Sequence, residues 1–497
     1  VEDVRAERAD QGPHILLGTS EQFPELGKDL SVTRSYRLLV DERRIVVCGC
    51  EDRGTAQGCY YLEELMNLRE APFLEKTDTV REPLFSPRMV HSGWGIDQYP
   101  DTHLKAIAHT GMDAVVVFVK GLNRTTSGFL DFNDLIARAG AFGLDVYFYS
   151  CMPSLKHPDD PDAESYYEST YGALFAACPG AKGVVLVGES CEFPSRDPNT
   201  NGIPLRDQKG KEQFSSKPNP GWWPCSDFPQ WLQLLQKVIA RRSRDADIVF
   251  WTYNWGWAPE KERMELIRSL PSGITLMATF EMFEQLWTGN VVHTCTDYTI
   301  SFEGPGEYFA SEAAEAHKRG LRLYTMCNTG GLTWDFGTVP YIPVPFQWGR
   351  RHAALHEARR KWGLSGLMES HHYGLWPSFV SELAKWSYWT PGLSTDQAAD
   401  RMAQRDFGTE GAPYAVEAWR AWSEAMRSYR PTNEDQYGPF RVGPAYPFLF
   451  HPHLTKTFGR QEIDMPSAPH AHFGSAIVKT FYHPYEDRRQ SPGRAAN

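Results

Sequence analysis

The stretch GVVLVGESCEFPSR, residues 183–196, decides how the rest of the chain is interpreted. Its apolar run, Val184 to Val187, predicts a strand that is buried on both faces, as strands of parallel sheets are. Glu189 follows this run and precedes a polar loop, and ligands of parallel α/β folds bind at the carboxyl ends of strands. Between an apolar wall and a loop, its carboxyl group can be held protonated, as a general acid must be. The alternative is a Glu that caps the next helix or pairs with Arg196.

Strand-like and helix-like segments alternate on both sides of this stretch. The other expected strands span 88–92, 114–119, 146–150, 248–253, 275–280, 323–326 and 367–368. The expected helices span 102–111, 131–142, 163–177, 227–243, 259–270, 309–319 and 346–362. Eight strand–helix units over about 300 residues predict an α/β fold of the (β/α)8 TIM barrel type. A strand-like piece at 298–302 makes the count uncertain by one, and a doubly wound open sheet is the alternative, although no glycine-rich phosphate motif opens a helix.

Changes in pattern divide the chain into three parts. Residues 1–80 contain three short strands, 15–18, 36–40 and 45–49, and one amphipathic helix, so we expect a small α+β domain. The barrel is expected over 81–378, with a long insertion at 191–226 that we interpret as a lid or subsite wall. Residues 379–497 are predicted to form a helical region followed by an extended tail.

Bulk composition excludes several classes of protein. The 497 residues carry a formal net charge of −11 with no basic block, which argues against a nucleic-acid partner. The apolar runs are of strand length, so no membrane span is predicted. Nine scattered cysteines suggest mostly reduced thiols, and no signal-like segment is seen, which favours the cytoplasm over secretion. No cofactor or metal is expected, and a homo-oligomer is compatible with this composition.

Aromatic residues are unusually frequent, with 16 tryptophans in the chain. Several tryptophans stand near predicted strand ends or in loops, where an indole ring can stack on the apolar face of a sugar. Flat ligands and plain core packing use tryptophan as well. The pattern favours an oligosaccharide or polysaccharide as the partner.

Three carboxylates, Glu189, Glu281 and Glu369, end three different predicted strands. Glycoside hydrolysis uses two such groups, one as the acid and one as the nucleophile or base. We expect Glu189 to be the acid, with Glu281 opposite it and Glu369 as the next choice. A salt bridge or a hydrogen bond to a sugar hydroxyl is the alternative role for each.

Other polar and aromatic residues near strand ends are predicted to bind the substrate. They are Arg88, His91, Trp94, Lys120, Trp251, Tyr253, Asn254, Asn328, Trp334, Asp335, His371, His372 and Trp376. The adjacent histidines do not predict a metal site, because neighbours on a strand point to opposite faces.

Residues 45–70, IVVCGCEDRGTAQGCYYLEELMNLRE, resemble the closing strand and helix of the small N-terminal domain of β-hexosaminidases and α-glucuronidases. The barrel start, Ser86-Pro87-Arg88, and the segment HLKAIAHTGMDAVVVF are also similar to these glycoside hydrolases. The stretch from Asp406 to Trp419 resembles the C-terminal region of α-glucuronidases. The likeness spans most of the chain and matches no diagnostic motif in full.

This resemblance implies an exo-acting glycoside hydrolase that removes a terminal amino sugar or uronic acid. Hexosaminidases that use the N-acetyl group of the substrate carry an Asp-Glu pair after the fourth strand, whereas Gly188 precedes Glu189 here. The α-glucuronidase layout therefore fits better, and Arg88, Lys120 and Arg196 are candidate partners of a uronate. A carbohydrate-binding barrel without catalysis, and a lyase or isomerase on the same fold, are the alternatives.

Overall fold

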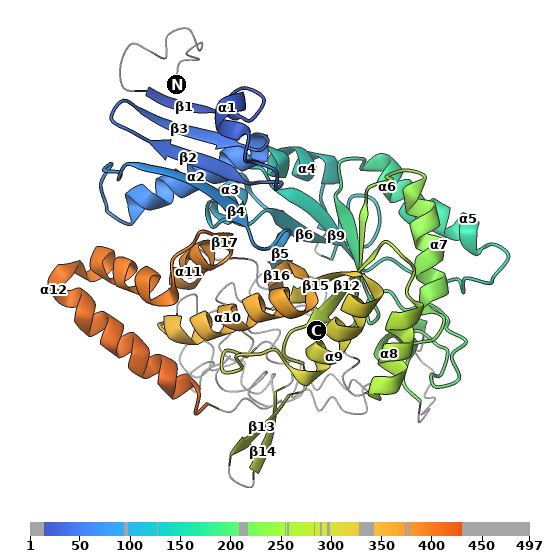
Figure 1. Ribbon diagram of the computed structural model, residues 1–497. Coiled ribbons are helices and arrows are strands. Elements are labelled where there is room, and N and C mark those ends of the chain that lie inside the picture. The colour runs from blue at the N-terminus through green and yellow to red at the C-terminus, as the bar shows by residue number, and fades with distance from the viewer. Residues whose placement is uncertain are drawn as a thin grey trace, which may run out of the picture.

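The computed structural model describes residues 14–93, 98–126, 128–207, 217–253, 255, 258–282, 284–288, 291–295, 299–327, 342–372, 375 and 378–429. Parallel strands close into an eight-stranded barrel at its centre (Figure 1). They are β5 (Arg88–Gly93), β6 (Ala114–Val119), β9 (Asp145–Ser150), β10 (Gly183–Val187), β11 (Asp247–Trp251), β12 (Ile274–Thr279), β15 (Arg322–Met326) and β16 (Leu364–His372). The barrel confirms the predicted (β/α)8 class and all eight predicted strands.

Helices cover the outside of the barrel and connect its strands. They are α3 (Asp101–His109), α4 (Phe132–Ala141), α5 (Ala163–Tyr167), α6 (Ala173–Ala177), α7 (Phe228–Ala240), α8 (Glu260–Ser269), α9 (Glu307–Arg319) and α10 (Pro345–Trp362). The helix predicted over 163–177 is interrupted by a π-helical turn, Glu168–Gly172. Local sequence sets some of the ends: Asp131 caps α4 by accepting hydrogen bonds from the backbone N–H groups of Asn133 and Asp134.

The strands are buried on both faces because the helices shield one face and the barrel interior the other. Every residue of β6, AVVVFV, is buried. Such continuous apolar runs are what parallel strands require, since neither face meets water. The piece predicted as a possible extra strand at 298–302 forms no strand over its described residues, 299–302.

The first part of the chain forms a separate five-stranded sheet. Its strands are β1 (His14–Thr19), β2 (Tyr36–Val40), β3 (Arg44–Gly49), β4 (Thr77–Pro83) and β17 (Trp389–Thr390). The helix α2 (Asp52–Asn67) packs on this sheet, and a short helix, α1 (Pro24–Gly27), follows β1. β17 pairs antiparallel with β4, so the C-terminal part of the chain completes a sheet that the N-terminal part begins.

Buried polar contacts join this sheet to its neighbours. Arg34 donates to the Asp145 carboxylate at 2.6 Å and to the carbonyl oxygen of Gly143 at 3.0 Å, both at the start of β9. Arg81 in β4 donates to the Pro391 carbonyl at 2.8 Å, and its guanidinium lies 4.0 Å from the ring centroid of Tyr61. These contacts hold the sheet against the barrel and the C-terminal helices.

Two further helices, α11 (Phe379–Ser387) and α12 (Thr395–Met426), follow the barrel and pack beside α10. Capping boxes begin both, with Ser378 and Ser394 as the capping residues. α12 breaks at Gly408, whose φ of 68° and ψ of 171° are not helical. A residue with a side chain rarely adopts this positive φ, so glycine permits the change of direction.

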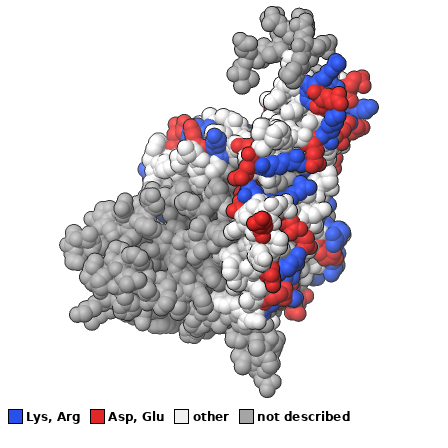
Figure 2. Space-filling view, turned by 90° about the vertical axis from the view of Figure 1, so that its left-hand side faces the viewer, with Lys and Arg blue, Asp and Glu red and all other residues white. Residues whose placement is uncertain are grey.

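Two small hairpins, β7 (Arg124–Thr125) with β8 (Gly128–Phe129) and β13 (Glu284–Thr288) with β14 (Val291–Cys295), extend from the barrel loops. No helix in the described part of the chain combines the length and apolar character that crossing a lipid bilayer requires. On the face drawn in Figure 2, basic and acidic side chains are interspersed without a large patch of one sign among the residues that are described.

The amino-end layer of the barrel interior is polar. The buried Asp247 carboxylate accepts hydrogen bonds from Tyr147 at 3.2 Å, Tyr324 at 2.8 Å, Thr275 at 2.6 Å and Arg322 at 3.2 Å. Burial, followed by the charge of Asp247, raises the pKa values of both tyrosines. These partners satisfy the carboxylate inside the fold, which makes this layer a fixed support for the rest of the barrel.

Candidate active site

Glu189 lies where the sequence predicts it, just after the carboxyl end of β10, and is half-buried. Gly188 before it is tightly enclosed: a Cβ atom there would lie 3.0 Å from the Trp255 ring and 3.2 Å from the Gly221 carbonyl oxygen. An Asp at this position would therefore require its neighbours to shift. The close packing gives a physical reason why the Asp-Glu pair is absent from this turn.

Aromatic side chains from neighbouring strands form a wall at the same end of the barrel. The His91 ring of β5 stacks on Tyr149 of β9 with centroids 4.7 Å apart and lies 4.3 Å from Phe118 of β6. Tyr149 meets Trp251 of β11 edge-on at 6.3 Å, and Trp251 lies 4.9 Å from Tyr253. We call these five residues the aromatic wall. Sequence analysis predicts three of them: His91, Trp251 and Tyr253.

The Glu189 carboxylate lies beside this wall. Its charge is the largest cause after burial of the raised pKa of the Tyr149 phenol. The indole N–H of Trp251 donates to the Thr279 hydroxyl of β12 at 3.0 Å, which fixes the indole ring. An acidic group next to a rigid aromatic surface has the composition of a site for a sugar ring, which needs both an apolar face and polar partners.

His91 is neutral in this setting. Burial lowers the pKa of its imidazole from 6.5 to about 3, because a charged ring would lose its hydration there. A neutral imidazole can form hydrogen bonds with hydroxyl groups without adding charge to the site.

Glu281 has a different environment from the one predicted. Its fully buried carboxylate forms a two-pronged ion pair with Arg351 of α10, with N–O distances of 2.5 and 2.7 Å. Arg351 also donates to the carbonyl oxygens of Thr299, Phe302 and Cys327 at 2.9, 2.8 and 2.7 Å. The pair thus ties together the loops after β12 and β15, and the predicted role of Glu281 as catalytic partner stays a prediction.

Glu369 also faces away from the wall. Its carboxylate accepts hydrogen bonds from the Tyr388 hydroxyl at 3.2 Å and the Cys327 thiol at 3.6 Å. Tyr388 follows α11, outside the barrel, and its ring lies 5.1 Å from that of His352 in α10. These two contacts direct the carboxylate toward the layer between β16 and the helices, and its predicted catalytic role stays a prediction.

Arg88, which is predicted to bind the substrate, lies away from the carboxyl ends of the strands. It is the first residue of β5, at the amino end of the barrel, and it is fully buried. Its guanidinium donates to the carbonyl oxygens of Gly111 at 2.7 Å and Phe85 at 2.6 Å and pairs with Asp113 at 3.3 Å. A charged residue beside a strand points to the ligand crevice only at the carboxyl end of that strand, and Arg88 occupies the opposite end.

Lys120 and Arg196, the other cationic candidates, differ in their position and in their partners. Lys120 follows the carboxyl end of β6 and is exposed, on the face of the barrel that also holds Glu189. Arg196 pairs with Asp159 at 3.3 Å and Asp160 at 2.8 Å. Lys120 is therefore the better placed partner for an anionic sugar.

Several predicted site residues lie outside what the structure describes. These are Trp94, Asn254, Asn328, Trp334, Asp335 and Trp376, together with the side chains of His371 and His372. Their predicted roles remain predictions. No cluster of potential metal ligands occurs among the residues that are described.

The insertion at 191–226 is anchored in its described parts, 191–207 and 217–226. Glu192 is buried and accepts hydrogen bonds from the backbone N–H groups of Leu205 and, at 3.1 Å, of Gly221. The Trp255 indole donates to the Gly221 carbonyl at 3.1 Å, and a Cβ atom at Gly221 would lie 2.8 Å from the Cα of Glu189. Of the two predicted roles, lid or subsite wall, these contacts favour a wall beside Glu189.

Sequence analysis missed Phe118, Tyr149 and Thr279, which complete the wall and its support. Each stands at the last or next-to-last position of its strand. The alternation of side chains along a strand would have predicted that each points into the barrel, as the other residues of the site do. The apolar strand sequences concealed them, because aromatic residues there also suit the core.

No protein-family model matches the sequence, and no curated protein is significantly similar to it. Solved structures of glycoside hydrolases do resemble it. A GH138 enzyme targeting pectin rhamnogalacturonan II is 11% identical over 83% of this chain with a TM-score of 0.52, and this chain spans only 55% of its length. The N-acetyl-β-hexosaminidase of Streptomyces plicatus is 12% identical over 81% of this chain and 91% of its own, with a TM-score of 0.47.

A third solved structure, CpGH84B, is 14% identical over 80% of this chain and 65% of its own, with a TM-score of 0.43. At these identities the similarity is one of fold. The predicted resemblance is confirmed at that level: the chain shares with the GH138 enzyme the fold of a TIM barrel, and a small α+β unit precedes the barrel here.

Proposed function

We propose that the protein is an exo-acting glycoside hydrolase in which Glu189 is the general acid. The observation that carries this proposal is the position of one half-buried carboxylate at the carboxyl end of β10, beside the aromatic wall. The wall supplies the stacking surface for a terminal sugar, and Glu189 donates a proton to the glycosidic oxygen as the bond to the leaving group breaks. The oxygen of a water molecule forms the new bond to the anomeric carbon, and a carboxylate base takes the proton of that water. The likeness to glycosidase folds supports the same class of reaction.

A terminal uronic acid is the substrate that we favour over an amino sugar. The enclosed Gly188 leaves no group at that position to orient an N-acetyl arm, whereas Lys120 offers a cation at the same end of the barrel. The pectin-directed enzyme with a similar fold acts on a glycan that this proposal would accommodate. Hydrolysis of aryl uronides and aryl N-acetylhexosaminides, compared under the same conditions, distinguishes the two sugars.

The test of the proposal is Glu189→Gln. We expect turnover of the best aryl glycoside to fall by roughly 1,000-fold or more, with little change in sugar binding, because the acid is lost and the shape is kept. Glu192→Gln is the matched comparison, since that carboxylate anchors the insertion and should affect stability before turnover. Near-normal turnover in Glu189→Gln contradicts the proposal.

Glu281 and Glu369 favour a second candidate function, carbohydrate binding without hydrolysis. Both predicted partners of Glu189 are engaged away from the wall. In that case the wild-type protein binds a sugar from a glycan panel but releases no product from any member. Release of a monosaccharide from an oligosaccharide excludes this alternative.

A further inference from the structure

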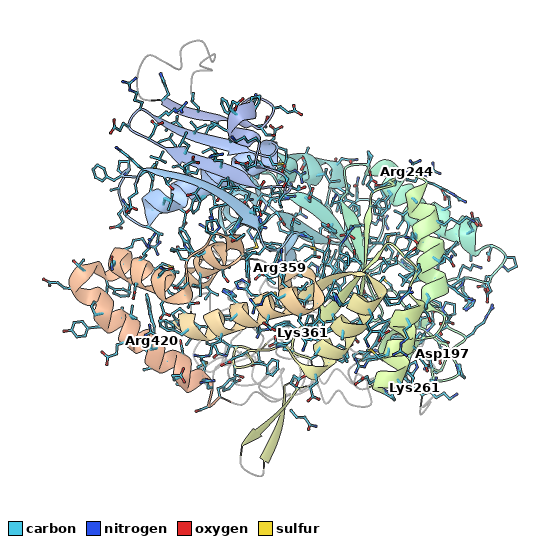
Figure 3. The ribbon with its side chains drawn as sticks, in the orientation of Figure 1. Asp197, Arg244, Lys261, Arg359, Lys361 and Arg420 are labelled. Atoms are coloured by element: carbon cyan, nitrogen blue, oxygen red, sulfur yellow. The ribbon has the colours of Figure 1, made fainter. Side chains whose placement is uncertain are left out.

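A second cavity lies on the outer side of the barrel, between the insertion and α8. Its volume is about 520 Å³, within the range of about 300–1,000 Å³ usual for small-molecule sites. One side is made by 197–199 and 223–226 of the insertion, and the other by α8 from Glu262 to Ser269. Figure 3 shows Asp197 beside the part of α8 that carries Lys261. We call this cavity the α8 groove.

An indole ring forms part of the α8 groove. Trp223 is half-buried and packs on the main core while it also lines the groove, together with Pro224 and Leu266. An aromatic ring that is fixed by the core and partly open beside apolar neighbours is suited to stack against the C–H face of a sugar ring.

The α8 groove also contains polar atoms that have no hydrogen-bond partner among the described residues. The indole N–H of Trp223 and the Oε2 atom of Glu262 are covered from solvent, and neither forms a hydrogen bond within that part of the chain. A buried polar group without a partner costs about 1–3 kcal/mol, so a local shift of the lining that exposes one of these atoms to a ligand hydroxyl gains a hydrogen bond without breaking another. The exposed Asn199 side chain on the rim differs from these two atoms, since its amide nitrogen donates to the Asp197 carboxylate at 3.0 Å.

The charges of the lining define which sugars fit. Asp197, Glu262 and Glu265 contribute carboxylates, and the guanidinium of Arg268 is held by Glu315 at 2.9 Å. An excess of carboxylates repels an anionic chain and accepts hydrogen bonds from hydroxyl groups. The lining therefore suits a neutral segment instead of a run of uronic acids.

The α8 groove is connected to Glu189 by a short piece of chain. The turn Pro220–Trp222 contacts the Glu189 backbone through Gly221, and Trp223 follows it into the groove. The turn links the two places without making them one cavity.

From these observations we propose that the α8 groove is a second carbohydrate-binding site, which takes a neutral, hydroxyl-rich glycan segment by stacking on Trp223 and hydrogen bonding to Glu262 and Asn199. Binding there does not require hydrolysis at Glu189. The proposal therefore goes beyond the proposed function and can be tested separately from it.

The test uses the full chain with Glu189→Gln, so that no probe is cleaved. Binding of cellohexaose, xylohexaose and mannohexaose is measured by calorimetry, with hexagalacturonate as the charged comparison. At least one neutral hexasaccharide should bind, and Trp223→Ala should weaken its binding by about tenfold or more, as loss of an aromatic stacking contact predicts. Trp422→Ala is the matched control, since Trp422 is an exposed indole on α12, with 49% of its surface accessible.

Glu262→Gln provides a second variant in case Trp223→Ala loses stability, and it should weaken binding while melting stays unchanged. In the otherwise wild-type chain, Glu262→Gln should leave hydrolysis of a small aryl glycoside unaltered. Binding of no neutral probe, equal binding by the Trp223→Ala and Trp422→Ala proteins, or hexagalacturonate bound as well as the neutral probes would each overturn the proposal. None of these results depends on whether Glu189 is the acid.

Discussion

The two ends of one barrel interior hold carboxylates in opposite situations. At the amino end, Asp247 is buried and accepts four hydrogen bonds from side chains of three other strands. At the carboxyl end, Glu189 is half-buried and stands on a turn beside aromatic rings. The first carboxylate is held by the fold, whereas the second is the one that we propose as the general acid. Burial, more than residue type, separates these two acids.

Glycines at both ends of the barrel leave space that neighbouring side chains or backbone atoms occupy. A Cβ atom at Gly366 would lie 2.4 Å from the Tyr324 ring, and one at Gly183 would lie 2.9 Å from the Tyr147 ring. These small residues admit the two tyrosines that hold Asp247. At the other end, Gly188 and Gly221 allow the insertion to approach Glu189 closely. Glycine residues thus make room for the two tyrosines at the amino end of the barrel and for the insertion at the carboxyl end.

The largest effect on stability is expected at the carboxyl end, from Arg351→Met. The change leaves the Glu281 carboxylate buried without its ion pair, which should cost about 3–5 kcal/mol in the free energy of unfolding. Urea denaturation measures this. Arg350→Met, next to it on a partly exposed side chain, should cost much less.

Combining Arg351→Met with Glu281→Met should recover a large part of that loss, because no charge of this pair then remains buried. The single change Glu281→Gln distinguishes a structural role of Glu281 from a catalytic role. Lower stability with turnover retained in the folded fraction supports the structural role. Full stability with turnover abolished would restore Glu281 as a catalytic residue.

Asp247→Ala should come next, with a loss of about 3 kcal/mol, since its buried hydroxyl partners lose their acceptor. Glu189→Gln should change stability by less than about 1 kcal/mol, the usual range for a partly exposed position. Asp245→Ala, an exposed residue just before β11, serves as the control. If Asp247→Ala and Glu189→Gln lower the free energy of unfolding by the same amount, the contrast between the two ends of the barrel is wrong.

Trp251→Phe tests the aromatic wall and should change the free energy of unfolding by less than Arg351→Met or Asp247→Ala. An aromatic ring is kept, but the hydrogen bond to Thr279 is lost, which should cost about 1–2 kcal/mol and let the ring reorient. We expect a higher KM for a small aryl glycoside with a smaller change in kcat, because stacking acts on binding. A change confined to kcat would show that Trp251 acts on the reacting groups instead.

His352→Leu is expected to alter the response to acid. Burial lowers the pKa of His352 from 6.5 to about 3, so below pH 6.5 the unfolded chain binds a proton that the folded chain does not. Stability therefore falls as pH decreases, by up to about 1.4 kcal/mol per pH unit for this group. Neither ring nitrogen of His352 forms a hydrogen bond with a described residue, so leucine should be tolerated at pH 7.

Comparing unfolding at pH 7 and pH 5 checks this prediction. The wild-type protein should lose more stability over this interval than His352→Leu does. His91, whose pKa burial also lowers to about 3, remains in both proteins and contributes equally. An identical pH dependence in the two proteins would show that His352 does not titrate as described.

Particular residues show how far sequence alone reaches. Strand ends predicted Glu189, His91, Trp251 and Tyr253 as site residues. Tyr149 links them at one end of the barrel, because parallel strands bring their carboxyl ends together. The same rule did not anticipate that Arg88 begins its strand, or that Glu281 and Glu369 contact Arg351 and Tyr388. Glu281 lies just beyond β12, where the alternating pattern no longer fixes the direction of a side chain, and Glu369 lies inside β16, whose pairing with β5 shifts register on both sides of Ser370.

The sequence by itself determined the alternation of apolar strands and amphipathic helices, because burial on both faces demands continuous apolar runs. It also determined that an acidic residue follows the fourth strand of the barrel. Only the tertiary structure decided which charges meet: Arg351 with Glu281 and Asp247 with its hydroxyl partners lie tens of residues apart along the chain. Such pairings depend on how helices pack on the barrel, and no local pattern encodes that packing.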